Sequence, residues 1–194
     1  MKGFHMILLA MNQTGWHNLV KLQSEAADKN TYNGRFYVDD ELLRKYNEGL
    51  IMTTACIASR TAYLINCFKF KEAEEQMLKW YDIFKDRMYL EVQPLPIQRQ
   101  ITVNKIYVSW SQKYHIPLIA TNDVHYLTEA DHDDHDTLLC MGMKNKYKDT
   151  KDRLRYDNEF WLRTREEMEQ AFKKQIYTDS SLEPGEDKIL TKAY

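Results

Sequence analysis

The sequence predicts an α/β protein with parallel strands, and three observations support this fold class. Short apolar runs alternate with segments of helical periodicity through most of the 194 residues. Hydrophobic residues make up 43% and charged residues 29% of the chain, as in an ordinary soluble globular protein. Polar side chains directly follow the apolar run 116–120, and α/β proteins gather ligands at the carboxyl ends of strands. The length allows one full core, or one domain with a small extra piece.

The first fifty residues predict a strand and two helices. Residues 4–10 are apolar apart from His5, which is typical of a strand buried on both faces. A helix follows with Thr14 as its cap, and its apolar stripe consists of Trp16, Leu19, Val20 and Leu22. A short second helix, capped by either Asp39 or Asp40, runs through Tyr46 and ends at residues 47–49.

The middle of the chain continues the alternation of strands and helices. Strands are expected where short apolar runs lie between turns, and helices where apolar residues recur at helical spacing. In chain order, the expected elements are a strand over 50–56, helices over 60–68 and 71–84, a strand over 88–92, a helix over 98–114, a strand over 116–120 and a helix over 129–141. The composition turns polar beyond residue 172, so we expect 173–194 to be a tail or the start of a further segment.

Charge and cysteine content exclude several classes of protein. The net charge of -2 argues against a dedicated nucleic-acid binder, although the basic surface of a DNA-processing enzyme can lie on another domain. Three cysteines are too few for a disulfide framework, and no Cys-x-x-Cys pair indicates a zinc knuckle. Both points favour a reducing, cytoplasmic compartment. The apolar N-terminal run has no cleavage-site pattern, and no segment is long enough to span a bilayer.

The strand end at residues 120–126 carries the clearest candidate site. Asp123 and His125 are two residues apart, so their side chains leave an extended segment on the same side. Such a pair can begin a metal site or an acid–base pair. His5 and Cys56 lie on other predicted strands and have the chemistry of zinc or manganese ligands. For each of these two alone, the stronger interpretation is a hydrogen-bonded core histidine or a small buried apolar cysteine.

The cluster of acidic residues and histidines at 131–136 has two interpretations. On a helix, His132 with Asp136 and Asp131 with His135 are four residues apart, so either pair could chelate a metal. The stronger interpretation is a solvated, acidic first turn at the positive end of a helix dipole.

Six parts of the chain together resemble the PHP (polymerase and histidinol phosphatase) domain of bacterial or phage DNA polymerase III alpha subunits. The most specific of them is Thr121-Asn122-Asp123-Val124-His125-Tyr126 after an Ile-Pro strand. The matching stretches stand in family order: 4–12, 49–56, 89–93, 116–126, 135–140 and 153–168. We therefore expect residues 1–172 to form a partial PHP domain.

The resemblance implies a distorted, TIM-like β/α barrel with metal ions at the carboxyl ends of its strands. Four residues match metal ligands of the family: His5, Cys56, Asp123 and His125. Three more are expected beside those ligands: Asn122, His135 and Glu91. The implied cofactor is a divalent cation, zinc or manganese, with magnesium as a third candidate. No residue is assigned a catalytic role.

The family pattern also contains motifs that this sequence does not show. The family domain opens with a His-x-His strand, an Asp-His pair and a strand ending in Glu, all upstream of the part that matches 4–12. We therefore expect an incomplete barrel, an N-terminally truncated fragment of a split or truncated phage-type gene, with unpaired apolar strand edges. Metal binding by the isolated chain is expected to be weak or absent, because about half of the ligands would be missing.

Three functions follow as hypotheses. The first is a fragment of the PHP domain of a replicative DNA polymerase, with no polymerase activity of its own and a metal-dependent 3′–5′ exonuclease site that is inactive in isolation. The second is a stand-alone PHP phosphoesterase, and the third is a non-catalytic replisome scaffold module. The first implies as partners the rest of the alpha subunit or a separately encoded N-terminal piece, DNA through that polymerase, and a proofreading exonuclease subunit. No membrane partner is expected.

Overall fold

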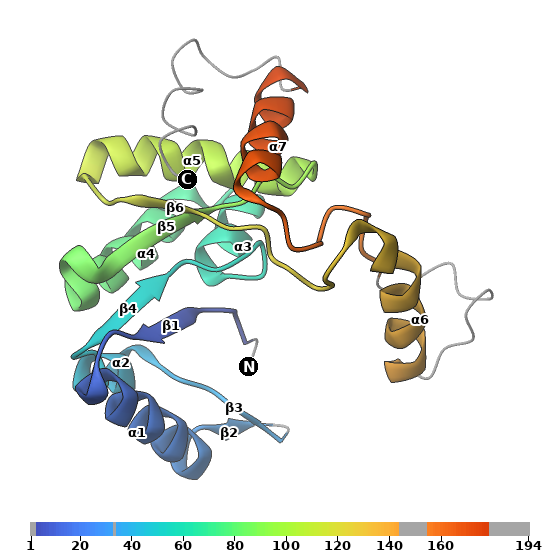
Figure 1. Cartoon of the computed structure of the whole chain (residues 1–194). Coiled ribbons are helices and arrows are strands. Elements are labelled where there is room, and N and C mark those ends of the chain that lie inside the picture. The colour runs from blue at the N-terminus through green and yellow to red at the C-terminus, as the bar shows by residue number, and fades with distance from the viewer. Residues whose placement is uncertain (1–2, 33, 144–154, 179–194) are drawn as a thin grey trace.

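The computed structural model of the chain describes residues 3–32, 34–143 and 155–178. Its centre is a four-stranded sheet in the order β1-β4-β5-β6 (Figure 1). The four strands are β1 (Ile7–Ala10), β4 (Leu50–Thr53), β5 (Met88–Val92) and β6 (Leu118–Ala120). Sequence features expected at 153–154 and 179–194 lie outside the described residues.

The three strands β4, β5 and β6 run parallel, as the alternation of strands and helices predicted. Met52 pairs with Met88 between β4 and β5, and Leu90 pairs with Leu118 between β5 and β6. Helices make the crossovers between these strands, which is the connection that parallel neighbours require. The α/β prediction is therefore confirmed, and the described strands form an open sheet rather than a closed barrel.

The direction of β1 differs from the prediction, because β1 runs antiparallel to β4. The chain leaves β1 through α1 (Gln13–Lys29) and returns through α2 (Asp40–Tyr46), and these two helices pack together. The return brings the chain back to the end of β1 that it left, where the Met11 amide donates to the Gly49 carbonyl at 2.8 Å. β4 then starts beside the end of β1 and must run the opposite way.

Two glycines allow this close return. A Cβ atom on Gly15 would lie 2.0 Å from the Gly49 carbonyl oxygen, so a larger residue at position 15 would separate α1 from the turn. Gly49 has a φ of +69°, a left-handed conformation that L-residues with a Cβ adopt at a cost. The pairing of β1 with β4 therefore depends on the absence of two side chains.

The expectation that the first strand is buried on both faces is wrong. Ile7 is 40% exposed and Leu9 is 50% exposed. The physical reason is that β1 lies at the edge of the sheet, with β4 as its single strand neighbour among the described residues. An edge strand leaves one row of backbone groups, and the side chains beside it, open to solvent.

Helix α1 also differs from the prediction in its cap and its buried face. Asn12, rather than Thr14, caps the helix, because its side-chain oxygen accepts a hydrogen bond from the Gly15 amide at 2.9 Å. Trp16 and Val20 point to solvent, and the buried positions of the helix are Gly15, Asn18, Leu22 and Ala26. Asp39 caps α2 as expected, accepting from the Leu42 amide.

The remaining helices lie close to their predicted ranges, and five short or late elements were not expected. The predicted helices are α3 (Arg60–Asn66), α4 (Phe70–Phe84), α5 (Gln98–Tyr114) and α6 (His132–Gly142). The additions are the hairpin of β2 (Thr31–Tyr32) and β3 (Arg35–Phe36), the 3-10 turns η1 (Lys85–Arg87) and η2 (Glu129–Asp131), and α7 (Arg165–Thr178). No described helix is long and apolar enough to cross a membrane.

The main core lies between the sheet and helices α1 to α5 (Figure 1). α7 contributes Phe172, which is fully buried in this core, and the buried Gln175, which donates to the Leu95 carbonyl. The boundary expected at residue 172 thus falls inside a helix that continues to Thr178. A second, smaller apolar cluster forms around Leu95, Tyr126 and Phe160.

Replacing Leu90 on the central strand β5 should weaken folding strongly. Leu90 is fully buried, so Leu90→Ala removes apolar contacts and leaves a cavity, at a cost of about 3 kcal/mol in the free energy of unfolding. Urea denaturation followed by circular dichroism measures this loss. Leu138→Ala is the matched control, because Leu138 is 65% exposed on α6, and its cost should stay below about 0.5 kcal/mol. Equal losses in the two variants would contradict the placement of the core.

Candidate metal centre

One edge of the sheet collects the candidate ligands. The carboxyl ends of β4 and β6 lie at the same edge because both strands run parallel to β5. Cys56 follows the end of β4, and Asp123 follows the end of β6. His5 reaches this edge from the opposite direction, since it precedes the antiparallel β1. The reversed direction of β1 is therefore what brings the first candidate ligand to the others.

His5 and Cys56 are in contact. The His5 amide donates to the Ala58 carbonyl at 3.1 Å, which ties the residue to the loop after β4. Cys56 Sγ lies 3.6 Å from His5 Nδ1. Burial raises the pKa of the Cys56 thiol, and the negative charges of Asp123 and Glu91 add to that effect. A cation bound at the sulfur would favour the thiolate and displace the proton.

Asp123 lies within electrostatic reach of the same pair. Burial raises the pKa of its carboxyl group, the charge of Glu91 adds to the rise, and His125 and His5 oppose it. The Cys56 thiol also hydrogen-bonds to this carboxylate, which favours the ionised form. Asp123 has a φ of +51°, and Ala55, which precedes Cys56, has a φ of +56°. Both strand ends that carry candidate ligands thus pass through the left-handed region, where backbone strain often marks functional sites.

His125 is oriented by the backbone next to it. Its Nδ1 lies 2.6 Å from the Asp123 carbonyl oxygen, so the tautomer that donates from Nδ1 leaves the Nε2 lone pair free for a metal. Its ring packs on Tyr156, with centroids 4.3 Å apart, and on Phe160 and His135 at longer range. The side chain is exposed, so a cation from solvent can reach it.

Glu91, Asn122 and His135, predicted to lie beside the ligands, have different surroundings. Glu91 is buried on β5 and accepts hydrogen bonds from both neighbouring strands. Asn122 is buried and donates to the Trp161 carbonyl at 2.5 Å, while Arg163 donates to its side-chain oxygen. His135, on α6, contacts the His125 ring, and burial lowers the pKa of His135, with the neighbouring His125 and His132 lowering it further.

The segment 155–164 supplies contacts that the sequence did not predict. The His125 amide donates to the Phe160 carbonyl at 2.8 Å, and Tyr126 pairs with Trp161 in an isolated bridge. The pKa of Tyr156 is raised by burial, and the charges of Asp123 and Cys56 add to the rise, which places its phenol beside the ligands. The aromatic residues at 156, 160 and 161 are the sequence feature that could have indicated these contacts.

The acidic cluster at 131–136 serves the local structure. Asp131 accepts from the Thr128 amide at 2.7 Å and closes the turn before α6. His132 Nε2 lies 2.9 Å from the Tyr156 carbonyl oxygen, which joins α6 to the segment after 155. Asp133 and Asp134 are exposed in the first turn of α6. These contacts favour the interpretation as a solvated first turn.

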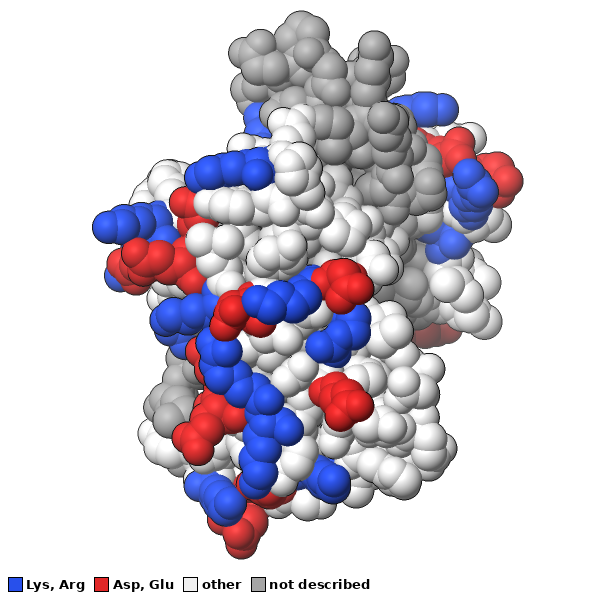
Figure 2. All heavy atoms as spheres, turned by 90° about the vertical axis from the view of Figure 1, so that its left-hand side faces the viewer, with Lys and Arg blue, Asp and Glu red and all other residues white. Residues whose placement is uncertain are grey.

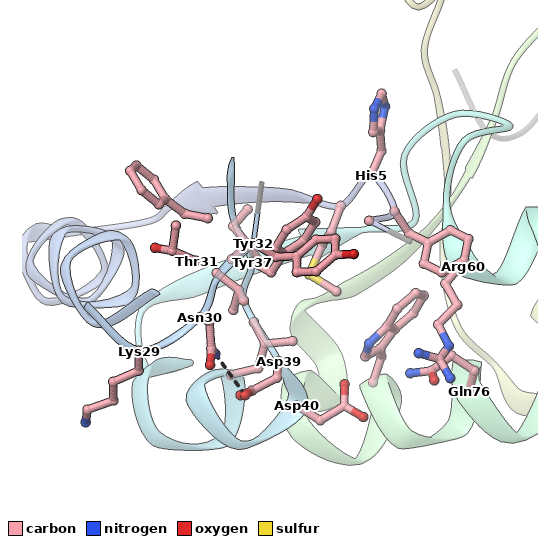
Figure 3. A pocket seen from close by; sticks show the side chains of 18 residues that line it. His5, Lys29, Asn30, Thr31, Tyr32, Tyr37, Asp39, Asp40, Arg60 and Gln76 are labelled. Atoms are coloured by element: carbon pink, nitrogen blue, oxygen red, sulfur yellow. Dashed lines mark hydrogen bonds between the residues drawn. The ribbon is translucent and has the colours of Figure 1, made fainter. Parts of the chain in front are cut away.

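A cavity of about 700 Å³ opens on the other side of β1. Phe4, Met6 and Leu8 line it together with aromatic residues of the β2–β3 hairpin and of α4. Figure 3 shows the His5 ring turned away from the centre of this cavity, where Tyr32 and Tyr37 lie. The cavity is therefore separate from the candidate metal centre, although His5 borders both.

The contacts among the candidate ligands are pairwise. Within the residues that the structure describes, no three His, Cys, Asp or Glu side chains form a group that could hold a metal ion as they stand. The donor types nevertheless suit zinc, which accepts imidazole, thiolate and carboxylate, better than magnesium, which prefers oxygen ligands. The chemistry of the donors thus fits a metal, and side chains would have to move to enclose one.

The comparisons with known proteins agree on one family. The profile of the PHP domain matches residues 1–94. The DNA polymerase III subunit alpha of Borreliella burgdorferi is 38% identical over 171 residues, which cover 88% of this chain and 15% of that protein. The subunit of the same name in Aquifex aeolicus is 41% identical over 144 residues, or 72% of this chain and 12% of that protein. That of Thermus aquaticus is 34% identical over 166 residues, covering 85% of this chain and 13% of that protein. The chain therefore spans less than a sixth of the length of these relatives.

Removing the charge of Asp123 should stabilise the metal-free chain at neutral pH. The raised pKa means that the carboxyl group contributes stability below its unfolded pKa, and that this contribution is lost as the pH rises through the folded pKa. Asp123→Asn should therefore raise the melting temperature at pH 7, and the gain should shrink as the pH is lowered to about 4. Thermal unfolding with a chelator present measures both values.

The backbone conformation provides an internal control for this experiment. Asparagine tolerates the left-handed φ of position 123 well, and that benefit does not depend on pH. A gain that is the same at every pH would thus come from the backbone alone and would contradict the effect of burial.

Proposed function

We propose that this chain serves DNA replication as the PHP segment of a replicative polymerase. The chain belongs to the PHP domain family over residues 1–94 and is homologous to DNA polymerase III alpha subunits. Support comes from the length of the similarity, since the match to the Borreliella burgdorferi subunit covers 88% of the chain. The cysteine content is consistent with a cytoplasmic location.

The proposed cofactor is one divalent cation, zinc or manganese in preference to magnesium, held by His5, Cys56, Asp123 and His125. The observation that carries this proposal is the contact of His5 with Cys56 at the edge where Asp123 follows β6. A cation would also offset the charges that now raise the pKa values of the Cys56 thiol and the Asp123 carboxyl group.

The four donors limit the chemistry that such an ion can perform. A catalytic metal activates water or polarises a phosphate oxygen at an open coordination position. Four protein ligands fill the usual tetrahedral shell of zinc and leave no such position. We therefore infer a structural metal, with little 3′–5′ exonuclease activity in the isolated chain and no polymerase activity.

The proposed partner is the rest of a polymerase alpha subunit, on the same or a separately encoded chain. The exposed edge of β1, with Ile7 and Leu9 open to solvent, supports a strand or an apolar surface docking there. Lys and Arg are interspersed with Asp and Glu on the face shown in Figure 2. A face of mixed charge is not the basic surface that DNA binding needs, so we propose that the rest of the polymerase makes the contacts with DNA and with a proofreading exonuclease subunit.

The exposed edge of β1 also favours a second candidate, a non-catalytic module that contacts other replisome proteins. The two candidates differ in their need for metal, because a scaffold keeps its fold and its partner without an ion. A stoichiometric metal content in the purified chain would favour the first candidate.

Cobalt titration tests the metal proposal, because Co²⁺ replaces zinc and a thiolate ligand gives it a charge-transfer absorption band. The wild-type chain should show this band when Co²⁺ is added in excess, because the expected binding is weak. Cys56→Ser should abolish the band and weaken binding at least about tenfold. Cys67→Ser is the matched control, since Cys67 is an exposed cysteine at the end of α3, and it should behave as wild type. Loss of the band in both variants, or in neither, would refute the assignment of Cys56.

Nuclease assays test the inference of a structural metal. The purified chain, loaded with Zn²⁺ or Mn²⁺, should release no more nucleotide from a 3′-labelled DNA strand than buffer with the same metal. Robust hydrolysis that a chelator abolishes, and that His125→Ala removes, would show instead an open coordination position at this site.

A further inference from the structure

Glu91 is a buried carboxylate on the central strand of the parallel part of the sheet. It is 2% exposed and lies on β5, between β4 and β6. A carboxylate is rarely buried in this way unless hydrogen bonds replace its hydration. Its surroundings should therefore explain why the protein keeps a charge in its interior.

Three side chains donate to the Glu91 carboxylate, and they come from all three strands or the residues that follow them. Thr53, at the end of β4, donates to Oε2 at 2.5 Å. Thr121, just after β6, donates to Oε1 at 2.5 Å, and Gln93, just after β5, donates to the same oxygen at 3.1 Å. The Glu91 amide also donates to the Thr54 hydroxyl at 2.8 Å. One residue thus joins the ends of all three strands.

The two threonines are close in sequence to the candidate ligands. Thr53 lies three residues before Cys56, and Thr121 lies two residues before Asp123. The backbone enters the left-handed region at Ala55, which lies between Thr53 and Cys56, and at Asp123 itself, two residues after Thr121. Such conformations cost about 1–3 kcal/mol each and persist where the surrounding structure holds them. The hydrogen bonds of Glu91 anchor the chain immediately before both strained positions.

The same network extends toward His5. The Thr54 hydroxyl that accepts from Glu91 also hydrogen-bonds to the buried phenol of Tyr107, and Tyr107 lies 2.6 Å from the Thr61 hydroxyl. Ser59, which contacts Thr61 at 3.4 Å, forms the isolated bridge with His5. A continuous set of buried hydroxyls therefore connects Glu91 with the loop that holds the first candidate ligand.

We propose that Glu91 is a positioning residue of the metal centre, which holds the ends of β4 and β6 so that Cys56 and Asp123 face the same ion. This inference rests on the proposed metal-binding function. Glu91 acts through Thr53 and Thr121 rather than by touching the metal, and its negative charge lies close enough to influence both Cys56 and Asp123. The charge favours a bound cation, while the hydrogen bonds fix the direction of the strand ends.

The test compares Glu91→Gln with the wild-type chain by Co²⁺ titration, with the thiolate band as the readout. Glutamine keeps the shape but removes the charge, and its NH₂ group would face a hydroxyl that donates to Glu91 in the wild-type chain. We expect the Co²⁺ affinity to fall by about 10- to 100-fold, as for other residues that orient metal ligands. Glu74→Gln is the matched control, because Glu74 bonds Lys113 and Tyr114 on a different part of the surface, and its affinity should equal that of wild type.

A pair of threonine variants keeps the test valid if Glu91→Gln does not fold. Thr121→Ser retains the hydroxyl that donates to Glu91, and Thr121→Val removes it at nearly constant volume. The serine variant should bind Co²⁺ like wild type, and the valine variant should bind several-fold more weakly. A purely structural role would instead lower the melting temperature of the metal-free valine variant and leave its Co²⁺ affinity within twofold of the serine variant.

The outcomes separate the inference from the function on which it rests. A wild-type chain that shows no Co²⁺ band overturns the metal proposal and this inference together. A wild-type chain that binds Co²⁺, with Glu91→Gln binding it equally well, overturns the inference alone. Weaker binding in Glu91→Gln and Thr121→Val, with Glu74→Gln and Thr121→Ser unchanged, supports it.

Discussion

The antiparallel pairing of β1 with β4 is the constraint on which the rest of the structure depends. It follows from the return of the chain through α1 and α2 and from the close approach of Gly15 to Gly49. If β1 ran parallel to β4, the residues before β1 would lie at the opposite edge of the sheet, away from Cys56. Because β1 is reversed, His5 meets the loop after β4 and contacts the Cys56 sulfur. A local steric requirement at two glycines thus decides the composition of a site formed by residues far apart in the sequence.

The candidate centre concentrates features that cost folding free energy. Burial raises the pKa values of the Cys56 thiol and of the Asp123 carboxyl group, and the backbone is left-handed at Asp123 itself and at Ala55, next to Cys56. Glu91 adds a buried charge that is stabilised by hydrogen bonds from neighbouring strand ends. These groups lower the stability of the metal-free chain, so stability alone does not explain why they lie together. Their assembly at the carboxyl edge of parallel strands is what a cation would compensate.

The region around α6 has a separate role, because it determines where His125 lies. In Figure 1, α6 stands apart from the sheet, and the described segments 121–131 and 155–164 lie between α6 and the sheet. These segments pair with each other through His125, Tyr126 and Phe160, and Asn122 connects them to Trp161. His135 and His132 on α6 then pack against the same aromatic side chains. The fourth candidate ligand is therefore held by contacts among residues 122–161 rather than by the main core.

The sequence by itself determined the α/β class, the parallel strands β4, β5 and β6, the range of α5 and the four residues proposed as ligands. These follow from periodicity, from polar residues placed after apolar runs and from motifs, all of which are local in the chain. The tertiary structure alone decided the direction of β1, its exposed edge and the buried bonds of Glu91. Local patterns could not show them, because strand direction depends on how α1 and α2 return the chain. The partners of Glu91, Thr53 and Thr121, are 38 and 30 residues away and meet it only after the three strands pair.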